Sequence, residues 1–409
     1  MMDNSPASTV QMLDGLSVLD FTRVLAGPHC TRLLADLGAE VIKVERPGEG
    51  DEMRRAPERL AGEGDQSTYF VRRNAGKKSI AIDLGRAEGI KLVHALLPGI
   101  DVVVENFMPG VAARLGIAYE QLSAIKPDLV YCSISGYGQT GPMAQQGAFA
   151  HVVAAASGVM YQDAVAGTPT SSHSQAADAL AGTNGFGAVM AALWRRERTG
   201  QGAHVDVSML ESLIASEDIS FGSVPNGYEP MPTGQRVGMG LSQVHGRWIA
   251  WQSGGAPSLW PRLCAAMGRE ELLNDPRFST PDARREHWST MQGIVSDWLQ
   301  GSTDVHAALS ALKDARVPCA LVRSVEEVVA CEQLQARQTF SEVTHPAEMS
   351  VKVTSSPYWI DGAPVSARGS APYRIGEHTR AVLAERLGYS VAQIDSLAHA
   401  GIVATPPDT

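Results

Sequence analysis

Residues 17–45 read SVLDFTRVLAGPHCTRLLADLGAEVIKVE, and this stretch decides the fold. The short apolar run at 17–21 is typical of a buried strand, and Pro28 suits the first turn of a helix that follows it. Gly38 is placed to end that helix, and 40–45 then reads as a second strand. A strand, a helix and another strand in this order predict a unit with parallel strands.

The same alternation of strand and helix patterns continues through the first 136 residues. It predicts an α/β fold with a parallel sheet and helices on both faces. No GxGxxG pattern follows the first strand, so the standard dinucleotide-binding fingerprint is absent. The further expected strands are 79–84, 101–106 and 128–135, and the expected helices between them are 87–97 and a short one that ends at 115–116.

Side chains that suit a phosphorylated ligand follow several of these strands. Arg46 follows the second strand, and Asn106 with Phe107 follows the fourth. Ligands of such sheets bind beyond the carboxyl ends of the strands, so we expect these side chains on one edge. Each of them alone is ordinary turn chemistry. Their common place favours a phosphorylated, adenine-bearing ligand.

The composition excludes several classes of protein. The chain has 409 residues, of which 44% are hydrophobic, which suits one large or two ordinary domains. A net charge of −10 without a basic run argues against nucleic acid, and no apolar run is long enough to span a membrane. Five scattered cysteines and the lack of CxxC and HExxH pairs argue against a metal site. Reduced cysteines and a polar segment at 1–8 predict a cytoplasmic protein.

A second informative stretch is 175–187, in which Asp178 precedes three glycines. A long helical pattern follows and ends at 199–202. Glycine costs about 1 kcal/mol relative to alanine inside a helix, so three near its start indicate close approach of another backbone or of a ligand. A carboxylate at a helix N-terminus, with backbone N–H groups nearby, suits a nucleophile with an oxyanion site. The alternative is an ordinary first-turn acid with glycines for tight helix packing.

Motifs spread along the chain resemble one known family. They are 20–28 (DFTRVLAGP), 35–46 (ADLGAEVIKVER), 77–83 (KKSIAID), 104–107 (VENF), 133–138 (SISGYG), 199–202 with 205–209 (TGQG and VDVSM) and 375–379 (IGEHT). Together they resemble the class III CoA-transferases, the CaiB/BaiF family, of which formyl-CoA:oxalate CoA-transferase is the best-known type. The resemblance covers about residues 13–402.

The resemblance implies a fold and an assembly. Members of the family are interlocked homodimers. Each subunit has a large Rossmann-like domain built from both ends of the chain and a smaller α+β domain from the middle, where this chain becomes rich in Gly and Pro. For this chain we expect 10–215 to form the first part of the large domain, 216–344 the small domain with its linkers, and 345–409 a segment that returns to the large domain.

The resemblance also implies an activity, the transfer of CoA from an acyl-CoA donor to a carboxylic acid acceptor. The catalytic acid of the family falls on Asp178, which attacks the donor thioester and passes through a mixed anhydride and an aspartyl-CoA thioester. Both intermediates keep the acyl group activated. No permanently bound cofactor and no metal are implied. The partners are an acyl-CoA substrate, a small carboxylic acid and a second copy of the chain.

The family's contacts to CoA map onto eight positions of this chain. Arginine and lysine at the basic positions suit the phosphates of CoA. The positions are Leu25 and Ala26 at the thiol end, Arg46, Lys77 and Arg114 at the basic positions, and Asn74, Asn106 and Phe107 at the backbone and adenine-side contacts.

The chain departs from the oxalate-specific type on the acceptor side. Leu25 stands where that type has glutamine, and the mobile four-glycine run is replaced at best by Gly238 and Gly240, so oxalate is a doubtful acceptor. Many relatives have an aromatic–acid pair where this chain reads Phe149-Ala150-His151. His151 is therefore a candidate for the missing polar group, against the more common structural role of a lone helix histidine. Tyr137 is a further substrate-side candidate.

Two other functions are weighed against the transferase. α-Methylacyl-CoA racemases of the same family use the acid at Asp178 as a base paired with a histidine, which falls at or near Phe149. Phenylalanine transfers no proton, and His151 is two positions away, so the transferase is preferred. An inactive CoA-binding dimeric protein is the other alternative, and the retained Asp178 argues against it.

Overall fold

The computed structural model describes residues 12–62, 66–217, 219–230, 236–347 and 349–406. The chain divides into two compact units, one formed by its two ends up to Pro230 and from Gln335, and the other by Met231–Leu334. The domain limits expected from the sequence stay predictions, and the polar segment at 1–8 lies outside the described residues. Within the described part, no helix has the length and apolar character needed to cross a membrane.

The first unit is built on a seven-stranded sheet in the order β14-β3-β2-β1-β4-β5-β6. Only β14 is antiparallel to its neighbour, so the predicted parallel α/β sheet is confirmed. The strand order reverses between β1 and β4, which is where doubly wound sheets bind ligands. The strands are β1 (Ser17–Asp20), β2 (Glu40–Glu45), β3 (Lys78–Ile82), β4 (Val102–Glu105), β5 (Val130–Ser135), β6 (Ala203–Ser208) and β14 (Val403–Ala404).

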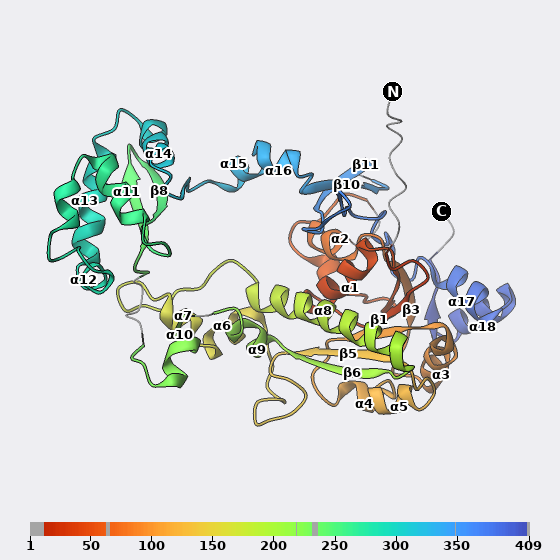
Figure 1. Cartoon of the computed structure of the whole chain (residues 1–409). Coiled ribbons are helices and arrows are strands. Elements are labelled where there is room, and N and C mark those ends of the chain that lie inside the picture. The colour runs from red at the N-terminus through yellow and green to blue at the C-terminus, as the bar shows by residue number, and fades with distance from the viewer. Residues whose placement is uncertain (1–11, 63–65, 218, 231–235, 348, 407–409) are drawn as a thin grey trace. The chain divides into compact units, whose positions relative to one another are not determined.

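Helices cover both faces of this sheet because neighbouring strand residues point to opposite sides. Val18 and Val104 pack toward α1 and α8, whereas Leu19 and Val103 pack toward α3 and α17. Figure 1 shows α8 along one face and α3, α4 and α5 along the other. The first face carries α1 (Ala26–Asp36), α6 (Ala150–Ala156), α8 (Ala176–Thr199) and α9 (Met209–Ile214), and the second carries α3 (Ala87–Leu96), α4 (Val111–Leu115), α5 (Tyr119–Ser123), α17 (Thr379–Leu387) and α18 (Val391–His399).

A separate apolar cluster in the first unit joins α2 (Thr68–Asn74) to a hairpin from late in the chain. Phe70 and Val71 pack there against Val343 and Val353. Within the first unit, the C-terminal part of the chain therefore packs against the N-terminal part both in this hairpin and in β14. The remaining elements of the unit are β10 (Phe340–His345), β11 (Met349–Thr354), β12 (Trp359–Ile360), β13 (Ala363–Pro364), α7 (Val159–Gln162), α10 (Ile219–Ser223) and the 3₁₀ helices η1 (Glu52–Arg55), η2 (Leu97–Gly99) and η3 (Val224–Asn226).

The second unit contains an antiparallel sheet in the order β7-β8-β9, with helices packed against it. Its core is rich in large side chains, among them Trp260, Phe278 and Trp288. The elements are β7 (Met239–Val244), β8 (Arg247–Gln252), β9 (Cys319–Leu321), α11 (Leu259–Met267), η4 (Glu270–Leu273), α12 (Pro281–Glu286), α13 (Trp288–Gln300), α14 (Val305–Asp314), α15 (Val325–Val329) and, at the boundary of the units, α16 (Glu332–Ala336).

Candidate active site

Asp178 lies partly buried in the first turn of α8, as the sequence predicts. The backbone N–H groups of Ala26 and Ala150 face its carboxylate closely enough to lower the pKa of that group. Ala26 is the first residue of α1, and Ala150 is the first residue of α6. The N-terminal ends of three helices therefore meet at this carboxylate, and their N–H groups and dipoles favour negative charge there.

The protonation of Asp178 is set by two opposing effects. Burial raises the pKa of its carboxyl group to about 6, although the N–H groups of Ala26 and Ala150 and the charge of Arg73 act in the other direction. The group is still mostly ionised at neutral pH. A carboxylate with a raised pKa is also more basic than an ordinary aspartate, which suits a nucleophile or a base.

The three glycines after Asp178 differ in their surroundings. A Cβ atom on Gly182 would lie 2.5 Å from the carbonyl oxygen of Ala26, and one on Gly185 would press on β5. Gly187 has no such neighbour within 4 Å. Close approach of the α1 backbone thus accounts for Gly182, and packed side chains of β5 and α1 account for Gly185. The packing at Gly182 brings the start of α1 to the carboxylate.

The loop between β1 and α1 has a strained conformation. Val24 has a φ of 68°, in the left-handed region that β-branched residues avoid. Its N–H donates to the Asp51 carboxylate over 3.3 Å. The side-chain amide of Asn106 accepts from the N–H of Arg23 and donates to its carbonyl oxygen, both over 2.8 Å. These contacts hold the loop that leads to Ala26, and strain of this kind is concentrated at functional sites.

Lys77 and Asn74 lie below this loop, in the protein interior. The Lys77 side chain is buried, and its Nζ lies 3.0 Å from Asp20 Oδ2, 2.7 Å from Thr31 Oγ1 and 3.0 Å from Asn74 Oδ1. The amide nitrogen of Asn74 donates to the carbonyl oxygen of Phe70. The donors of this ammonium are engaged inside the protein, and the phosphate contact expected of Lys77 stays a prediction. The CoA contact expected of Asn74 stays a prediction.

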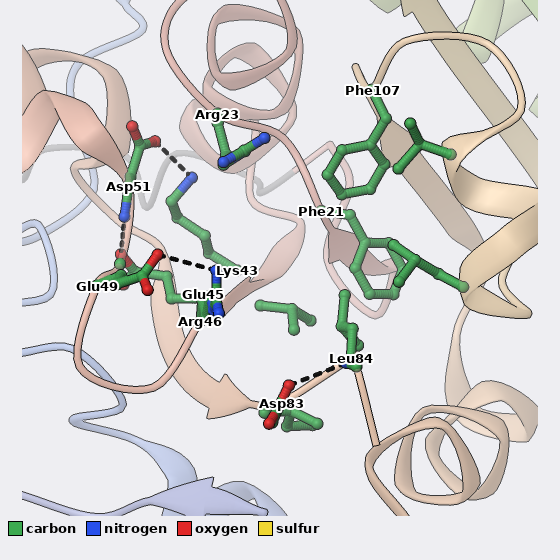
Figure 2. A pocket seen from close by; sticks show the side chains of 16 residues that line it. Phe21, Arg23, Lys43, Glu45, Arg46, Glu49, Asp51, Asp83, Leu84 and Phe107 are labelled. Atoms are coloured by element: carbon green, nitrogen blue, oxygen red, sulfur yellow. Dashed lines mark hydrogen bonds and ion pairs between the residues drawn. The ribbon is translucent and has the colours of Figure 1, made fainter. Parts of the chain in front are cut away.

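A pocket of about 380 Å³ opens beyond the carboxyl ends of β1, β2, β3 and β4 (Figure 2). Phe21 and Phe107 lie side by side on one wall. Arg46 is on the opposite side, where its Nη1 lies 3.1 Å from Glu49 Oε2. Arg23 lies above the Phe107 ring, with its guanidinium carbon 5.7 Å from the ring centre. The pocket combines an aromatic wall with basic side chains, which suits a flat ring that carries phosphates.

The other CoA-side candidates lie near these two places. Leu25 is the N-cap of α1 and is buried, next to Ala26. Arg114 is exposed on α4, the helix whose Val111 and Leu115 line the pocket. The structure thus places Ala26 at Asp178, and Arg46 and Phe107 in the pocket.

The substrate-side candidates are more dispersed. Tyr137 follows β5 and packs partly buried on the core of the first face. His151 is exposed next to Ala150, with Nδ1 3.0 Å from Ser171 Oγ, and it lines a pocket of about 240 Å³ beside the start of α8. Phe149, the N-cap of α6, is 69% exposed. A role for His151 in the chemistry stays a prediction.

Gly238 and Gly240 belong to the second unit, where packing accounts for both. A Cβ on Gly238 would lie 2.9 Å from the Cα of Gly254, and its φ is 86°. A Cβ on Gly240 would lie 2.0 Å from the indole of Trp251. Their expected part in substrate binding stays a prediction.

Sequence reasoning missed four side chains around Asp178: His29, Tyr69, Arg73 and Thr183. Arg73 Nη1 lies 2.9 Å from His29 Nδ1, and His29 Nε2 lies 3.3 Å from Thr183 Oγ1. Tyr69 and Arg73 both interact electrostatically with Asp178. They come from α2, far from α8 in the sequence, so no local pattern connects them. In the part of the chain that the structure describes, no cluster of three or more His, Cys, Asp or Glu is placed to hold a metal ion.

The chain is similar to known proteins over nearly its whole length. Residues 13–379 match the model of CoA-transferase family III. The succinyl-CoA:glutarate CoA-transferase of Mus musculus is 31% identical over 415 residues, covering 98% of this chain and 92% of that protein. The succinyl-CoA–D-citramalate CoA-transferase of Chloroflexus aurantiacus is 32% identical over 390 residues, covering 92% and 94%. The crystal structure of a CaiB/BaiF family protein from Brucella suis matches with a TM-score of 0.78 at 30% identity, over 91% of this chain and 99% of that one.

Proposed function

The chain belongs to CoA-transferase family III, and we propose that it moves CoA from an acyl-CoA donor to a small carboxylic acid through a covalent intermediate on Asp178. The observation that carries the covalent step is the placement of the Asp178 carboxylate at the N–H groups of Ala26 and Ala150. N–H groups in this position stabilise the Asp178 carboxylate and any oxyanion that forms at its side-chain carbon.

The first half of the proposed reaction removes CoA from the donor. A carboxylate oxygen of Asp178 attacks the carbonyl carbon of the thioester, the C–S bond breaks, and CoA leaves as a thiolate. The product on the enzyme is a mixed anhydride. The thiolate then attacks the side-chain carbonyl carbon of Asp178, the donor acid leaves as its carboxylate, and an aspartyl-CoA thioester remains.

The second half repeats these steps in reverse order with the acceptor. The acceptor carboxylate attacks the aspartyl carbonyl carbon, releases the CoA thiolate and forms a new anhydride. The thiolate attacks the acceptor carbonyl carbon of that anhydride, which yields the new acyl-CoA and restores the Asp178 carboxylate. No proton is taken from the α-carbon, and the energy of the thioester is kept because water is excluded from both intermediates.

The N–H groups of Ala26 and Ala150 have a part in each half. Two of the four attacks take place at the side-chain carbon of Asp178, so negative charge develops on the oxygen that these groups face. A donor of this type is worth roughly 3–4 kcal/mol in the transition state. The packing of Gly182 against the start of α1 holds one of the two donors in place.

The substrates are proposed from the pocket and from the relatives. The pocket of Figure 2, with Phe107 and Arg46, supports a place for the adenosine and phosphate part of CoA. The names of both relatives contain succinyl-CoA as donor and a dicarboxylic acid, glutarate or D-citramalate, as acceptor. We therefore expect small dicarboxylic acids here. The interlocked homodimer, the cytoplasmic location and the lack of a nucleic-acid partner stay predictions.

The experiment that tests the covalent step is a trap of the acylated protein. The chain is incubated with succinyl-CoA, treated with hydroxylamine, digested and mapped by mass spectrometry. We expect a hydroxamate on Asp178, loss of CoA transfer in Asp178→Ala, and retained CoA binding in Asp178→Asn. Glu211→Gln, which changes another first-turn acid on α9, is the matched control and should keep full activity.

Two outcomes would contradict the proposal. One is modification of another residue together with activity in Asp178→Ala. The other is rapid exchange of α-hydrogen for deuterium in 2-methylacyl-CoA, with no CoA exchange across a panel of acids. The second result would identify a racemase, for which His151 beside Ala150 is the candidate second base.

A further inference from the structure

A basic cluster lies beside Asp178, and the transfer steps above give it no role. His29 is at its centre, and Arg32, Arg72, Arg73 and Lys77 all act on it electrostatically. Burial and these charges lower the pKa of His29 to about 3, so the imidazole is neutral. A neutral imidazole can accept one hydrogen bond and donate another.

The hydrogen bonds of His29 fix the orientation of the Arg73 side chain. A guanidinium only donates, so the Nδ1 atom of His29, 2.9 Å from Arg73 Nη1, is the acceptor. Its Nε2 then carries the hydrogen and faces Thr183 Oγ1 at 3.3 Å. A Cβ on Gly182 would lie 3.0 Å from the Cβ of His29, so the ring lies on α8 one turn after Asp178. Arg73 is thereby oriented beside the candidate nucleophile.

The cations of this cluster differ in whether a carboxylate pairs with them. Arg32 is paired with Asp36 at 2.6 Å, and Lys77 with Asp20 at 3.0 Å. Arg73 forms no ion pair with any residue that the structure describes, and its hydrogen-bond partner is the neutral His29. Burial and the nearby Arg72 lower the pKa of Arg73 to about 10. A partly buried guanidinium in this setting is a ready partner for an anion.

The position of Arg73 beside Asp178 limits the kind of anion that it can bind. Tyr69 and Arg73 are one turn apart on α2, and both interact electrostatically with Asp178. All three residues are partly exposed, so a small molecule that reacts at Asp178 comes close to Arg73. When Asp178 is acylated it is neutral, and Arg73 then lacks the negative charge that faced it. A second carboxylate on the acyl group would restore that charge.

Resting on the proposed function, we propose that Arg73, oriented by His29, binds the non-reacting carboxylate of a dicarboxylic acid and so selects dicarboxylic over monocarboxylic substrates. The planar guanidinium matches a carboxylate with two parallel hydrogen bonds. No covalent step is added to the transfer. Arg73 determines which acids are accepted, and His29 is a positioning residue.

The test compares two acceptors of equal chain length with succinyl-CoA as donor. Glutarate and valerate both have five carbons, and they differ in the second carboxylate. We expect the wild-type chain to favour glutarate, and Arg73→Met to lower the glutarate-to-valerate ratio of kcat/KM by roughly 10- to 100-fold, the range for a hydrogen bond to a charged group. Because the donor is the same, any effect of the variant on the donor cancels in the ratio.

Three further variants make the test specific. Arg72→Met removes the neighbouring exposed cation, whose Nε bonds to Thr354 Oγ1, and should leave the ratio unchanged. Arg73→Lys keeps the charge without the planar fork and should recover part of the ratio. His29→Asn should raise KM for glutarate more than it lowers kcat, because it disturbs the orientation of the arginine.

The inference is overturned by an unchanged ratio in Arg73→Met, or by an equal fall for both acids. It is also overturned if the wild-type chain uses valerate as well as glutarate, a result that needs no variant to fold. Transfer of CoA to valerate with a hydroxamate on Asp178 would leave the proposed function standing in each of these cases. Transfer to neither acid, with no trapped acyl group, would contradict the proposed function itself.

Discussion

The Asp178 site and the rim of the pocket in Figure 2 lie at opposite ends of the same strained loop, and they are built differently. At Asp178 the partners are backbone N–H groups and partly buried side chains. At the rim the partners are exposed ion pairs, such as Arg46 with Glu49, whose side chains are 69% and 60% exposed. The first site is organised before substrate arrives, whereas at the second a ligand has to displace an acid that already neutralises the cation.

This difference has an energetic meaning. Below the loop, Lys77 and Asp20 form an ion pair whose side chains are both 0% exposed. Removal of one partner from a buried pair leaves an uncompensated charge, which is costly, while exposed pairs contribute little. Substitutions near Asp178 should therefore strongly affect the stability of the protein and the rate of the reaction. Substitutions at the rim of the pocket should change the affinity for CoA only weakly.

The largest effect is expected from Lys77→Met. Loss of the ammonium leaves Asp20 buried without its partner, which should lower the free energy of unfolding by about 3–5 kcal/mol. Lys78→Met is the matched control, because Lys78 pairs with Glu40 at 2.6 Å with both side chains about one third exposed. That change should cost no more than about 1 kcal/mol. Urea denaturation of both variants checks this, and equal costs would remove the distinction between the two ends.

The next effect concerns the glycine that lets α1 approach Asp178. A methyl group at Gly182 meets the carbonyl oxygen of Ala26, so Gly182→Ala should displace the N–H donor and lower kcat by roughly 100-fold, the effect of losing one oxyanion donor. Gly187→Ala, at an exposed position with no close neighbour, should keep kcat and stabilise the helix by up to about 1 kcal/mol. Steady-state kinetics of the pair test the role of the close approach. Similar kcat values for the two variants would contradict it.

A smaller effect should appear in the pH dependence of the reaction. Burial raises the pKa of Asp178 to about 6, and in the proposed reaction only the carboxylate attacks. The rate of acylation should therefore be flat above about pH 7 and fall about tenfold for each pH unit below 6. Phosphate groups also titrate near pH 6, so the affinity for CoA is measured at each pH as the control. A rate that stays flat to pH 4.5 would show that the group is not held at a raised pKa.

The smallest effect is expected at the rim. Glu49→Gln frees Arg46 from its exposed partner, and we expect CoA to bind a few times more tightly, a gain of no more than about 1 kcal/mol. Glu385→Gln, on the exposed surface of α17, makes the same charge change away from the pocket and is the control for net charge. Calorimetry with CoA gives both values. Weaker binding in Glu49→Gln would show that the acid itself contacts the ligand.

Local patterns were enough for much of the first unit. The strand at 40–45 has the bounds expected of it, and the helix before it begins and ends within two residues of Gly27 and Gly38, because apolar spacing, Pro28 and Gly38 act within a few residues of each other. Asp178 was placed correctly in the first turn of a long helix for the same reason.

Contacts between distant segments were beyond such patterns. Lys77 was expected at the phosphates of CoA, and no local pattern indicates that the fold buries it against Asp20. The pairing of Arg73 with His29 joins α2 to α1, and nothing in either stretch indicates the other. The glycines after Asp178 were read together, although their reasons differ and depend on which helix and strand lie across from each.

The position of β14 has a consequence for how the protein is made. Val403 pairs with Ile82, so the edge of the main sheet is completed by a strand that is synthesised long after β3. The second unit, Met231–Leu334, is continuous in sequence and is fully synthesised earlier. During synthesis β3 therefore has an open edge, which is prone to pair with other chains until β14 is available. Synthesis of β14, and the long-range pairing that follows, set the time at which the main sheet is complete.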